Sequence, residues 1–178
     1  MKQKVKGIVA IGDGNIIGKD KTLPWSRVPE DMKYFYRKTR GCTVIIGRKT
    51  AEGLGDIFPL KERDNIVLSH KDEKVVRNTV NGEEYSVCSS WKEAFQRATE
   101  KTVWVCGGRR VYESGLRFIE EFHVSRISNN HFEQKIGCAY ARWGFPQGDT
   151  WVLSSKKKKE NVAIEIYRRK NGKYTESY

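Results

Sequence analysis

Asp31 carries a carboxylate whose surroundings in the sequence could support chemistry. It follows Pro29 in a segment with helical spacing, and Phe35 lies one turn further along the same helical face. The apolar loop end Leu23-Pro24-Trp25 comes shortly before this segment. Taken alone, an acid in a first helical turn is explained by the helix dipole, which stabilises it by about 0.3–1 kcal/mol. Beside aromatic residues, the same carboxylate could instead face a pocket and hydrogen-bond a polar ligand.

Two glycine-containing turns could bring backbone N–H groups close to a phosphate. Gly107-Gly108 stands between an apolar strand and a helix, and Gly47-Arg48-Lys49-Thr50 repeats the pattern with two cations. An ordinary strand-to-helix turn explains the first segment equally well, and a solvated basic turn explains the second equally well. A third segment, Gly12 to Gly18, does not match the dinucleotide pattern G-x-G-x-x-G, because Ile17 occupies the last glycine position and no long helix follows directly.

Basic residues are in excess, with 34 Lys and Arg against 22 Asp and Glu and a formal net charge of +12. Such a charge attracts nucleic acid, but it also attracts phosphorylated cofactors and carboxylate-bearing substrates. The runs Lys156 to Lys159 and Arg168 to Lys170 are accompanied by no RNP-like aromatic pattern and no zinc-ligand spacing. A solvated hairpin is therefore the preferred interpretation of these runs.

The cysteines and histidines show no metal-site spacing. The four cysteines lie far apart without a C-x-x-C pair, which indicates reduced thiols and a cytoplasmic-type compartment. The three histidines have no ligand spacing, so no metal is expected. No apolar run approaches the roughly 18 residues of a membrane span, and we expect no membrane partner.

The hydrophobic pattern predicts strands that alternate with helices. Strands are expected over residues 7–11, 43–47, 65–69, 85–89, 103–106 and 122–127. Helices are expected over residues 29–39, 90–99 and 110–116, with a short helical turn after residue 50 and one long loop over residues 12–25. In the tail, the apolar segments 151–153 and 162–167 flank a charged turn that holds Lys156 to Lys159, which predicts an antiparallel hairpin.

This order of elements predicts an α/β fold with a mixed, mostly parallel central sheet, flanking helices and a C-terminal antiparallel hairpin. A chain of 178 residues is long enough for one sizeable core. Because neither an internal repeat nor a linker interrupts it, residues 1–178 are expected to form a single domain.

Taken together and in order, these segments resemble dihydrofolate reductase. The resemblance extends over about residues 5 to 127 and rests on the segments Ile8-Val9-Ala10, Ile17-Gly18, Leu23-Pro24-Trp25, Pro29-Glu30-Asp31-Met32-Lys33-Tyr34-Phe35, Thr39, Gly47-Arg48-Lys49-Thr50, Arg63-Asp64-Asn65-Ile66-Val67-Leu68-Ser69, Gly107-Gly108-Arg109-Arg110-Val111-Tyr112-Glu113 and Val124-Ser125-Arg126-Ile127. It implies a dihydrofolate reductase-like fold and NADPH-dependent reduction of 7,8-dihydrofolate to 5,6,7,8-tetrahydrofolate, with hydride transfer to pterin C6 and protonation of N5.

The resemblance also implies roles for the residues of the substrate site. Asp31 would hydrogen-bond the pterin 2-amino group and N3, Trp25 would hold a water near it, and Ser125 would support its carboxylate. The proton for N5 would arrive through water beside the loop that ends at Leu23. Arg63 would pair with the α-carboxylate of the glutamate tail. The implied substrate contacts are Ile8, Phe35, Leu54, Arg63, Cys106 and Tyr112.

For the cofactor NADPH, the resemblance implies that the backbones of Ala10 and Ile17 hold the nicotinamide. Thr50 and the turn after the 103–106 strand would cradle the phosphates, and the peptide between the paired glycines of that turn would be cis. Cations and polar groups after two strands would select the 2′-phosphate of NADPH. The implied cofactor residues are Ala10, Ile17, Gly47, Arg48, Lys49, Thr50, Ser69, His70, Gly107, Gly108, Arg109 and Arg110.

Three segments depart from the family pattern. Gly137-Cys138-Ala139-Tyr140 stands near the place where the family carries an acid that contacts the active-site loop. Arg109 replaces a frequent third glycine, and Leu60-Lys61-Glu62 makes the stretch before Arg63 longer than usual. These departures bear on loop closure, cofactor binding and the geometry around the substrate tail.

Two other functions stay open at this point. A pyrimidine reductase of the riboflavin pathway shares the architecture and NADPH, but Asp31 beside Leu23-Pro24-Trp25 favours the folate enzyme. A basic nucleic-acid-binding or structural protein on the same fold is suggested by the net charge of +12. We expect dihydrofolate and antifolates as ligands, no nucleic-acid partner, a monomer and a cytoplasmic location.

Overall fold

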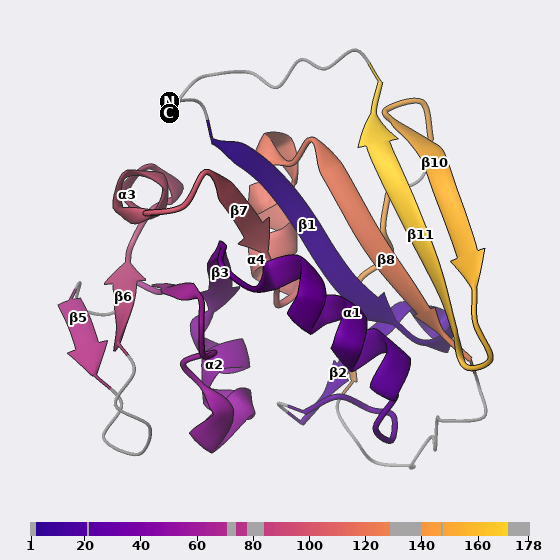
Figure 1. Cartoon of the computed structure of the whole chain (residues 1–178), viewed down its shortest axis with the longest axis horizontal. Helices are drawn as coiled ribbons and strands as arrows, with labels where there is room; N and C mark the ends of the chain where they lie inside the picture. The colour runs from indigo at the N-terminus through magenta and orange to yellow at the C-terminus, as the bar shows by residue number, and fades with distance from the viewer. Residues whose placement is uncertain are drawn as a thin grey trace.

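A nine-stranded sheet forms the centre of the fold. The computed structural model describes residues 3–20, 22–70, 74–77, 84–128, 140–146 and 148–170. The strands lie in the order β10-β11-β8-β1-β7-β3-β4-β6-β5. Their bounds are β1 Lys4–Ile11, β3 Thr43–Gly47, β4 Asp64–Leu68, β5 Lys74–Arg77, β6 Glu84–Cys88, β7 Thr102–Val105, β8 Glu121–Ile127, β10 Trp151–Lys158 and β11 Val162–Arg169. Figure 1 shows β1, β8 and β11 side by side in this sheet.

The middle of the sheet is parallel, and both of its margins are antiparallel. β1 runs parallel to β7 and β8, β3 to β4 and β7, and β4 to β6. β11 runs antiparallel to β8 and β10, and β5 to β6. The central strands are rich in Val and Ile, as is usual where helices cover both faces of a parallel sheet. These pairings confirm the predicted mixed, mostly parallel sheet and the C-terminal hairpin.

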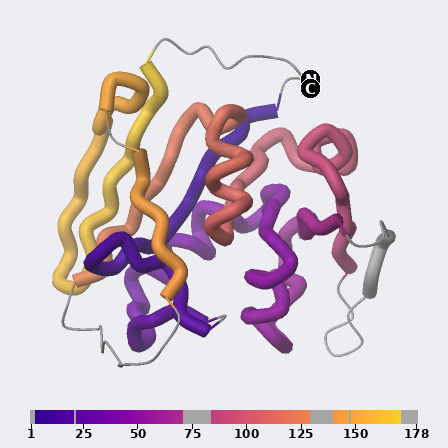
Figure 2. Tube along the Cα trace, turned by 180° about the vertical axis from the view of Figure 1, so that it is seen from behind, coloured from indigo at the N-terminus to yellow at the C-terminus, as the bar shows by residue number. Residues whose placement is uncertain are grey.

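Helices cover both faces of the sheet. The α-helices of the described residues are α1 Pro29–Thr39, α2 Arg48–Leu54, α3 Trp91–Arg97 and α4 Arg109–Gly115. α1 lies in front of the sheet in Figure 1, and α4 lies in front of it in the reverse view of Figure 2. Within the described ranges, none of the helices has the length and apolar character needed to cross a membrane.

The helices begin where their sequences favour a start. α1 has Pro29 at its first position, where the missing N–H needs no partner, and two acids in its first turn. At the start of α3, the Oγ of Ser90 accepts a 3.2 Å hydrogen bond from the N–H of Glu93. This is the bond that the capping-box pattern predicts.

Two apolar clusters fix the helices against opposite faces. Tyr34 of α1 packs in a cluster with Ile8 and Trp104 of the sheet. Tyr112 of α4 belongs to a second cluster, which includes Ile45. Because side chains alternate along a strand, β1, β3 and β7 each contribute to both clusters. This packing holds α1 against the sheet through Tyr34.

The chain over residues 12–25 is not one loop, as we expected, because it contains regular structure. A 3₁₀ turn at Asp13–Asn15 is followed by β2 (Ile16–Lys19), which pairs antiparallel with β9 (Tyr140–Arg142) in a separate two-stranded sheet. The next helix after the glycine segment is α1, which begins only at Pro29, consistent with the mismatch of this segment to the dinucleotide pattern. β2 and β5 were not predicted, because a short strand is recognised mainly by a partner that is distant in sequence.

The prediction that Lys156 to Lys159 form the hairpin turn is wrong for the first three lysines. Lys156, Lys157 and Lys158 belong to β10, and Lys156 Nζ lies 2.9 Å from Glu165 Oε1 on β11. Lysine suits an exposed strand because its stem can pack while its charge remains in water. Two other starts also differ: β1 begins at Lys4 and α2 at Arg48.

Candidate active site

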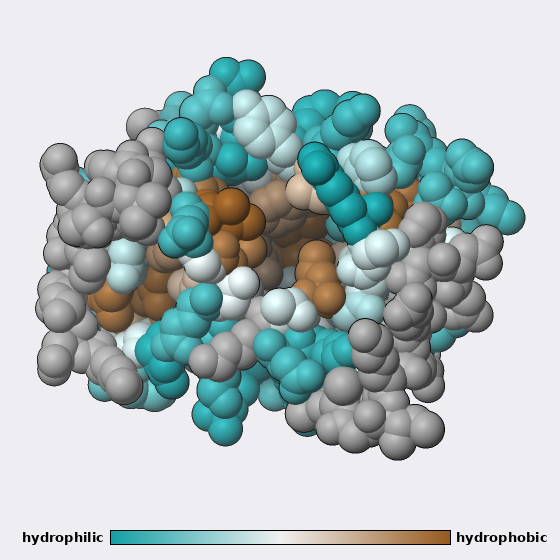
Figure 3. All heavy atoms as spheres, turned by 90° about the horizontal axis from the view of Figure 1, so that it is seen from below, coloured by the Kyte–Doolittle hydropathy of each residue, from teal (hydrophilic) through white to brown (hydrophobic). Residues whose placement is uncertain are grey.

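Asp31 lies in the first turn of α1, beside a hollow in the molecule. It is the third residue of the helix that begins at Pro29. The hollow has a volume of about 420 Å³ and is lined by Leu23, Trp25, Ser26, Arg27, Val28, Asp31 and Met32. Figure 3 views the molecule from below and shows apolar side chains inside a recess with a polar rim. The carboxylate therefore has access to a sheltered space on the surface.

The surroundings of Asp31 disfavour its negative charge. Burial raises the pKa of Asp31 above its usual value of 3.8, and a hydrogen bond with the side chain of Ser125 offsets part of this rise. Ser125 is only 1% exposed, so the contact lies in the interior. This pair joins α1 to β8 at the cleft.

A second polar contact joins the same two elements. His123 lies two residues before Ser125 on β8 and therefore points to the same face. Its Nδ1 lies 2.6 Å from the hydroxyl of Tyr34 on α1, and its Nε2 lies 2.8 Å from Glu121 Oε1. Burial lowers the pKa of His123 and raises the pKa of Tyr34 to about 12. Both side chains are thus neutral near pH 7. Their contact holds α1 against β8 close to Asp31.

The face of α1 that carries Asp31 continues through Phe35 to Thr39. Residues four apart lie one turn apart, so Asp31 and Thr39 are separated by about 12 Å along the axis. The hydroxyl of Thr39 donates to the carbonyl of Phe35 at 2.9 Å and accepts from Nε and Nη2 of Arg63 at 3.2 and 3.1 Å. One helix face therefore has a carboxylate at one end and a guanidinium at the other.

The ends of β1 and β7 form an uncharged wall near this face. The carbonyl of Ile8 accepts a 2.8 Å hydrogen bond from the hydroxyl of Tyr112, which is 4% exposed. Cys106 follows β7 directly, and its N–H donates to the carbonyl of Ile45 at 2.9 Å. Burial raises the pKa of Cys106 and that of Tyr112, so both groups keep their protons.

The glycine turns after β3 and β7 contact each other. The N–H of Gly47 donates a 2.6 Å hydrogen bond to the carbonyl of Gly107. A Cβ on Gly47 would lie 3.0 Å from Val111 Cγ2, and one on Gly108 would lie 3.0 Å from Thr50 Oγ1. The Gly107–Gly108 peptide is cis, as the resemblance implied. Glycine thus lets the two turns approach each other closely next to the hydroxyl of Thr50.

Comparison with known proteins agrees with this geometry. A sequence model of the family described as dihydrofolate reductase matches residues 4–169. The chain belongs to the dihydrofolate reductase family. Dihydrofolate reductase HdrB of Haloferax volcanii is 30% identical over 169 residues, which are 92% of this chain and 82% of that protein. The dihydrofolate reductase of Buchnera aphidicola subsp. Baizongia pistaciae is 31% identical over 170 residues, which are 94% of this chain and 91% of that protein.

A solved structure of a dihydrofolate reductase also resembles the fold. The enzyme from Enterococcus faecalis, complexed with NADP(H) and RAB-propyl, aligns with a TM-score of 0.74 and 25% identity. The alignment covers 94% of this chain and 97% of that one. The dihydrofolate reductase fold therefore accounts for nearly the whole chain.

The other residues predicted to contact the substrate differ in how deeply they are buried. Trp25 is buried and packs in the same cluster as Ile8, with Phe35 partly buried against it. Leu23 is 56% exposed and lies on the rim of the hollow. Leu54 packs in a different cluster at the end of α2. The residues predicted to bind the substrate thus lie mainly in the loop before α1, in α1 itself and at the ends of the central strands.

The cations predicted for the cofactor are partly engaged within their own helices. Arg48 pairs with Glu52 on α2, and Arg109 Nε lies 2.7 Å from Glu113 Oε1 on α4. The remaining predicted polar residues of these segments are exposed or half-buried; they are Lys49, Ser69, His70 and Arg110. Ala10 pairs with Ser125 in the register of β1 and β8, and Ile17 packs against the core from β2.

The longer stretch before Arg63 has a defined conformation in this reductase. The side chain of Asn65 accepts from the N–H of Leu60 and donates to its carbonyl, both at 2.9 Å. Glu62 has a φ of 60°, which is rare for a residue with a side chain. Of the other departures, Arg109 begins α4, and Tyr140 begins β9, whereas residues 137–139 lie outside the described part of the chain.

Sequence reasoning missed three residues that support the site. His123 and Tyr34 connect β8 to α1, and Tyr36 contacts Arg63. The alternation of β8 was a usable signal, because His123 must share the face of Ser125. The contact between Tyr36 and Arg63 has no comparable local signal, since the residues lie on separate elements.

Proposed function

We propose that this chain reduces 7,8-dihydrofolate to 5,6,7,8-tetrahydrofolate with NADPH. The observation that carries the proposal is the half-buried carboxylate of Asp31, which contacts Ser125 beside a hollow at one end of the α1 face. Membership of the dihydrofolate reductase family supports the same reaction. The proposal covers the reaction and the residues that hold the substrate.

The α1 face supports one orientation of dihydrofolate. In this orientation, Asp31 accepts hydrogen bonds from the pterin 2-amino group and N3, as an ionised carboxylate does for a bidentate donor. Phe35, one turn further, contacts the rings, and Leu54 packs on them from α2. Arg63 reaches the α-carboxylate of the glutamate tail, for which its planar guanidinium is suited. The spacing of about 12 Å along eight helical residues separates these two polar ends.

The glycine turns fit the phosphates of NADPH. A Cβ on Gly47, Gly107 or Gly108 would crowd Val111, Tyr112 or Thr50, so glycine lets the backbones of both turns lie close together beside the Thr50 hydroxyl. Arg48, Lys49, Ser69, His70, Arg109 and Arg110 would supply charge and hydrogen bonds for the phosphates. NADPH, when bound, supplies the hydride of the reaction. Among the described residues, no group of His, Cys, Asp and Glu could hold a metal ion, and the proposal includes none.

The residues of the chain also bear on the proton that the reaction consumes. Leu23 is exposed at the rim of the hollow, so water can approach the substrate beside it. Trp25 is buried and fixes the loop that leads into α1. We assign no side chain to direct protonation of pterin N5; water next to Leu23 delivers this proton, while Asp31 holds the ring in place.

The proposal extends to ligands, assembly and location. Antifolates that carry a pterin-like diamino ring would compete for Asp31. The assembly that we propose is a monomer. Free thiols at Cys42 and Cys106 support a reducing, cytoplasmic-type compartment.

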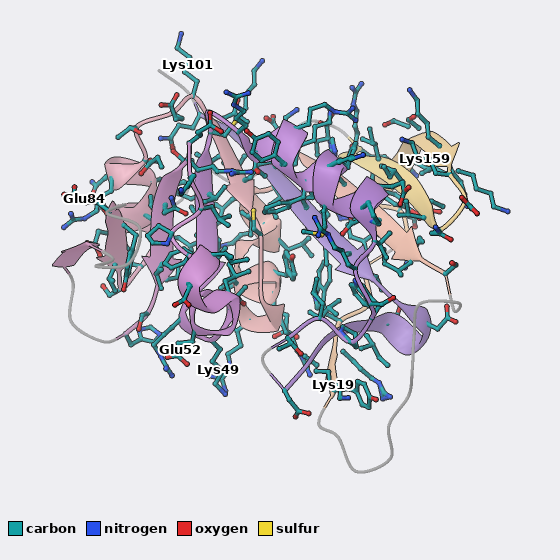
Figure 4. All side chains as sticks on the ribbon, turned by 60° about the horizontal axis from the view of Figure 1, so that its bottom comes forward. Lys19, Lys49, Glu52, Glu84, Lys101 and Lys159 are labelled. Carbon is teal, nitrogen blue, oxygen red and sulfur yellow. The ribbon has the colours of Figure 1, made fainter. Side chains whose placement is uncertain are left out.

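The arrangement of the basic residues does not favour nucleic-acid binding. Figure 4 shows Lys49 on α2, Lys101 before β7 and Lys159 in the hairpin turn projecting from different sides of the molecule. In the hairpin, Lys156 already pairs with Glu165. Binding of a polyanion depends on many cations that face it together.

The experiment that tests the proposal is a near-ultraviolet absorbance assay of NADPH oxidation with dihydrofolate. We expect turnover with NADPH that requires dihydrofolate and falls sharply with NADH, because NADH lacks the 2′-phosphate. If the chain oxidised no NADPH with dihydrofolate but bound DNA tightly in a salt-sensitive manner, the nucleic-acid alternative would replace the proposal.

A further inference from the structure

Arg63 lies in a compact cluster with Tyr36, Arg40 and Glu62. The guanidinium carbon of Arg63 lies 4.7 Å from the centre of the Tyr36 ring, at the distance of a cation–π contact. The ring is held in turn, because the Tyr36 hydroxyl donates a 2.6 Å hydrogen bond to Glu62 Oε2. Arg40 Nη2 donates to the other carboxylate oxygen of Glu62, also at 2.6 Å.

The conformation of the loop before Arg63 places Glu62 for this contact. Glu62 adopts a φ of 60°, and its carbonyl accepts a 2.8 Å hydrogen bond from the N–H of Gly41. Hydrogen bonds from Tyr36 and Arg40, together with the charge of Arg40, hold the pKa of Glu62 below its usual value. Glu62 is therefore ionised near pH 7 and remains an acceptor for the Tyr36 hydroxyl.

The hydrogen bonds of Arg63 leave one end of its guanidinium free to bind an anion. Nε and Nη2 share the hydroxyl of Thr39, and Nη1 donates to the carbonyl of Lys61 at 2.7 Å. Nη2 also reaches the carbonyl of Tyr36 at 3.5 Å, the upper limit for a hydrogen bond. With five N–H donors in all, Arg63 keeps one Nη1 hydrogen and a weakly held Nη2 hydrogen for a carboxylate.

We propose that Tyr36 is a positioning residue, which holds Arg63 in the orientation that binds the α-carboxylate of the substrate's glutamate tail. This inference rests on the proposed reduction of dihydrofolate. Thr39 and Lys61 fix the guanidinium at its edges, and the guanidinium carbon lies over the Tyr36 ring. The ring stops the guanidinium from rotating toward solvent, and Glu62 stops the ring from rotating away.

The inference is tested by comparing a substrate that has the glutamate tail with one that lacks it. Wild type, Tyr36→Leu and Tyr36→Phe are assayed with NADPH and either 7,8-dihydrofolate or 7,8-dihydropteroate. An exposed cation–π contact corresponds to a change in binding of about two- to fivefold. Tyr36→Leu should raise KM for dihydrofolate by about this factor, leave its kcat unchanged, and leave KM for dihydropteroate unchanged.

Tyr36→Phe and one control variant define what the ring and its hydroxyl contribute. Tyr36→Phe keeps the ring beside the guanidinium and loses the bond to Glu62, so its KM for dihydrofolate should lie between those of wild type and Tyr36→Leu. Lys33→Leu is the matched control, because Lys33 is an exposed residue of the same helix outside this cluster. It should leave the ratio of the two KM values as in wild type.

The outcomes separate the inference from the function on which it rests. If Tyr36→Leu raised KM equally for both substrates, or for neither, the positioning role would be overturned while the reductase activity of the wild type stood. If the wild type reduced neither substrate, the proposed function would fall and the inference with it. A melting temperature for Tyr36→Leu equal to that of wild type confirms that a selective change in KM arises at the tail.

Discussion

Replacing Asp31 by Asn should abolish most of the activity and at the same time stabilise the fold. Asn can donate but can no longer accept two charge-assisted hydrogen bonds from the pterin. Each such bond contributes about 1.5–3 kcal/mol, so losing both costs about 3–6 kcal/mol. At about 1.4 kcal/mol per factor of ten, kcat/KM for dihydrofolate should fall by about 10²- to 10⁴-fold.

The stability should change in the opposite direction, because burial raises the pKa of Asp31. A raised pKa means that the folded state disfavours the ionised form of Asp31. The stability that the protonated group contributes is fully present below pH 3.8, the pKa of the unfolded chain, and is lost as the pH rises through the pKa of the folded state. Asn carries no charge and is free of this loss. The midpoint of urea unfolding should therefore be higher for Asp31→Asn than for wild type at pH 7, and the difference should shrink at low pH.

The measurements are steady-state NADPH oxidation and equilibrium unfolding from acid to neutral pH. Asp56→Asn provides the control, since it makes the same chemical change at an exposed position, and it should alter neither property. The reasoning would be refuted by wild-type turnover in Asp31→Asn. A variant that lost activity together with stability would also contradict it, because damage to the fold would then explain both losses.

Two more substitutions test the contacts around the site. Tyr34→Phe removes a 2.6 Å hydrogen bond to His123 Nδ1 in the interior, and leaving a buried polar atom unpaired costs about 1–3 kcal/mol. The melting temperature should therefore fall by about 2–4 °C for each kcal/mol lost. An unchanged melting temperature would contradict the contact. Gly107→Ala places a Cβ 2.9 Å from the Tyr112 hydroxyl at a φ of +109°, which should cost about 1–3 kcal/mol and weaken NADPH binding measured by cofactor fluorescence. Unchanged binding in Gly107→Ala would exclude this turn from the cofactor site.

The sequence was most informative where local signals and packing agree. α1 and β3 have the predicted bounds because proline, charge and hydrophobic period all indicate the same residues. The positions of Asp31 and of the glycine turns followed from the order of the segments. The fold class followed from the alternation of strands and helices, which forces a mainly parallel sheet.

Contacts between distant segments could not be predicted in this way. β2 pairs with β9, and neither strand shows a strong alternation of its own. The lysines of β10 indicated a turn by composition, but pairing with β11 extends the strand through them. Likewise, the contact of Tyr36 with Arg63 depends on how the stretch before Arg63 folds, which composition does not specify.

The lysines of β10 affect how two copies of the protein approach each other, and this effect involves no ligand. It lies at the open margin of the nine-stranded sheet, where unpaired N–H and C=O groups can recruit a strand from another molecule. Lys157 and Lys158 are exposed along this margin. Two copies that approached edge to edge would bring their lysines together, and the resulting repulsion protects the molecule against aggregation.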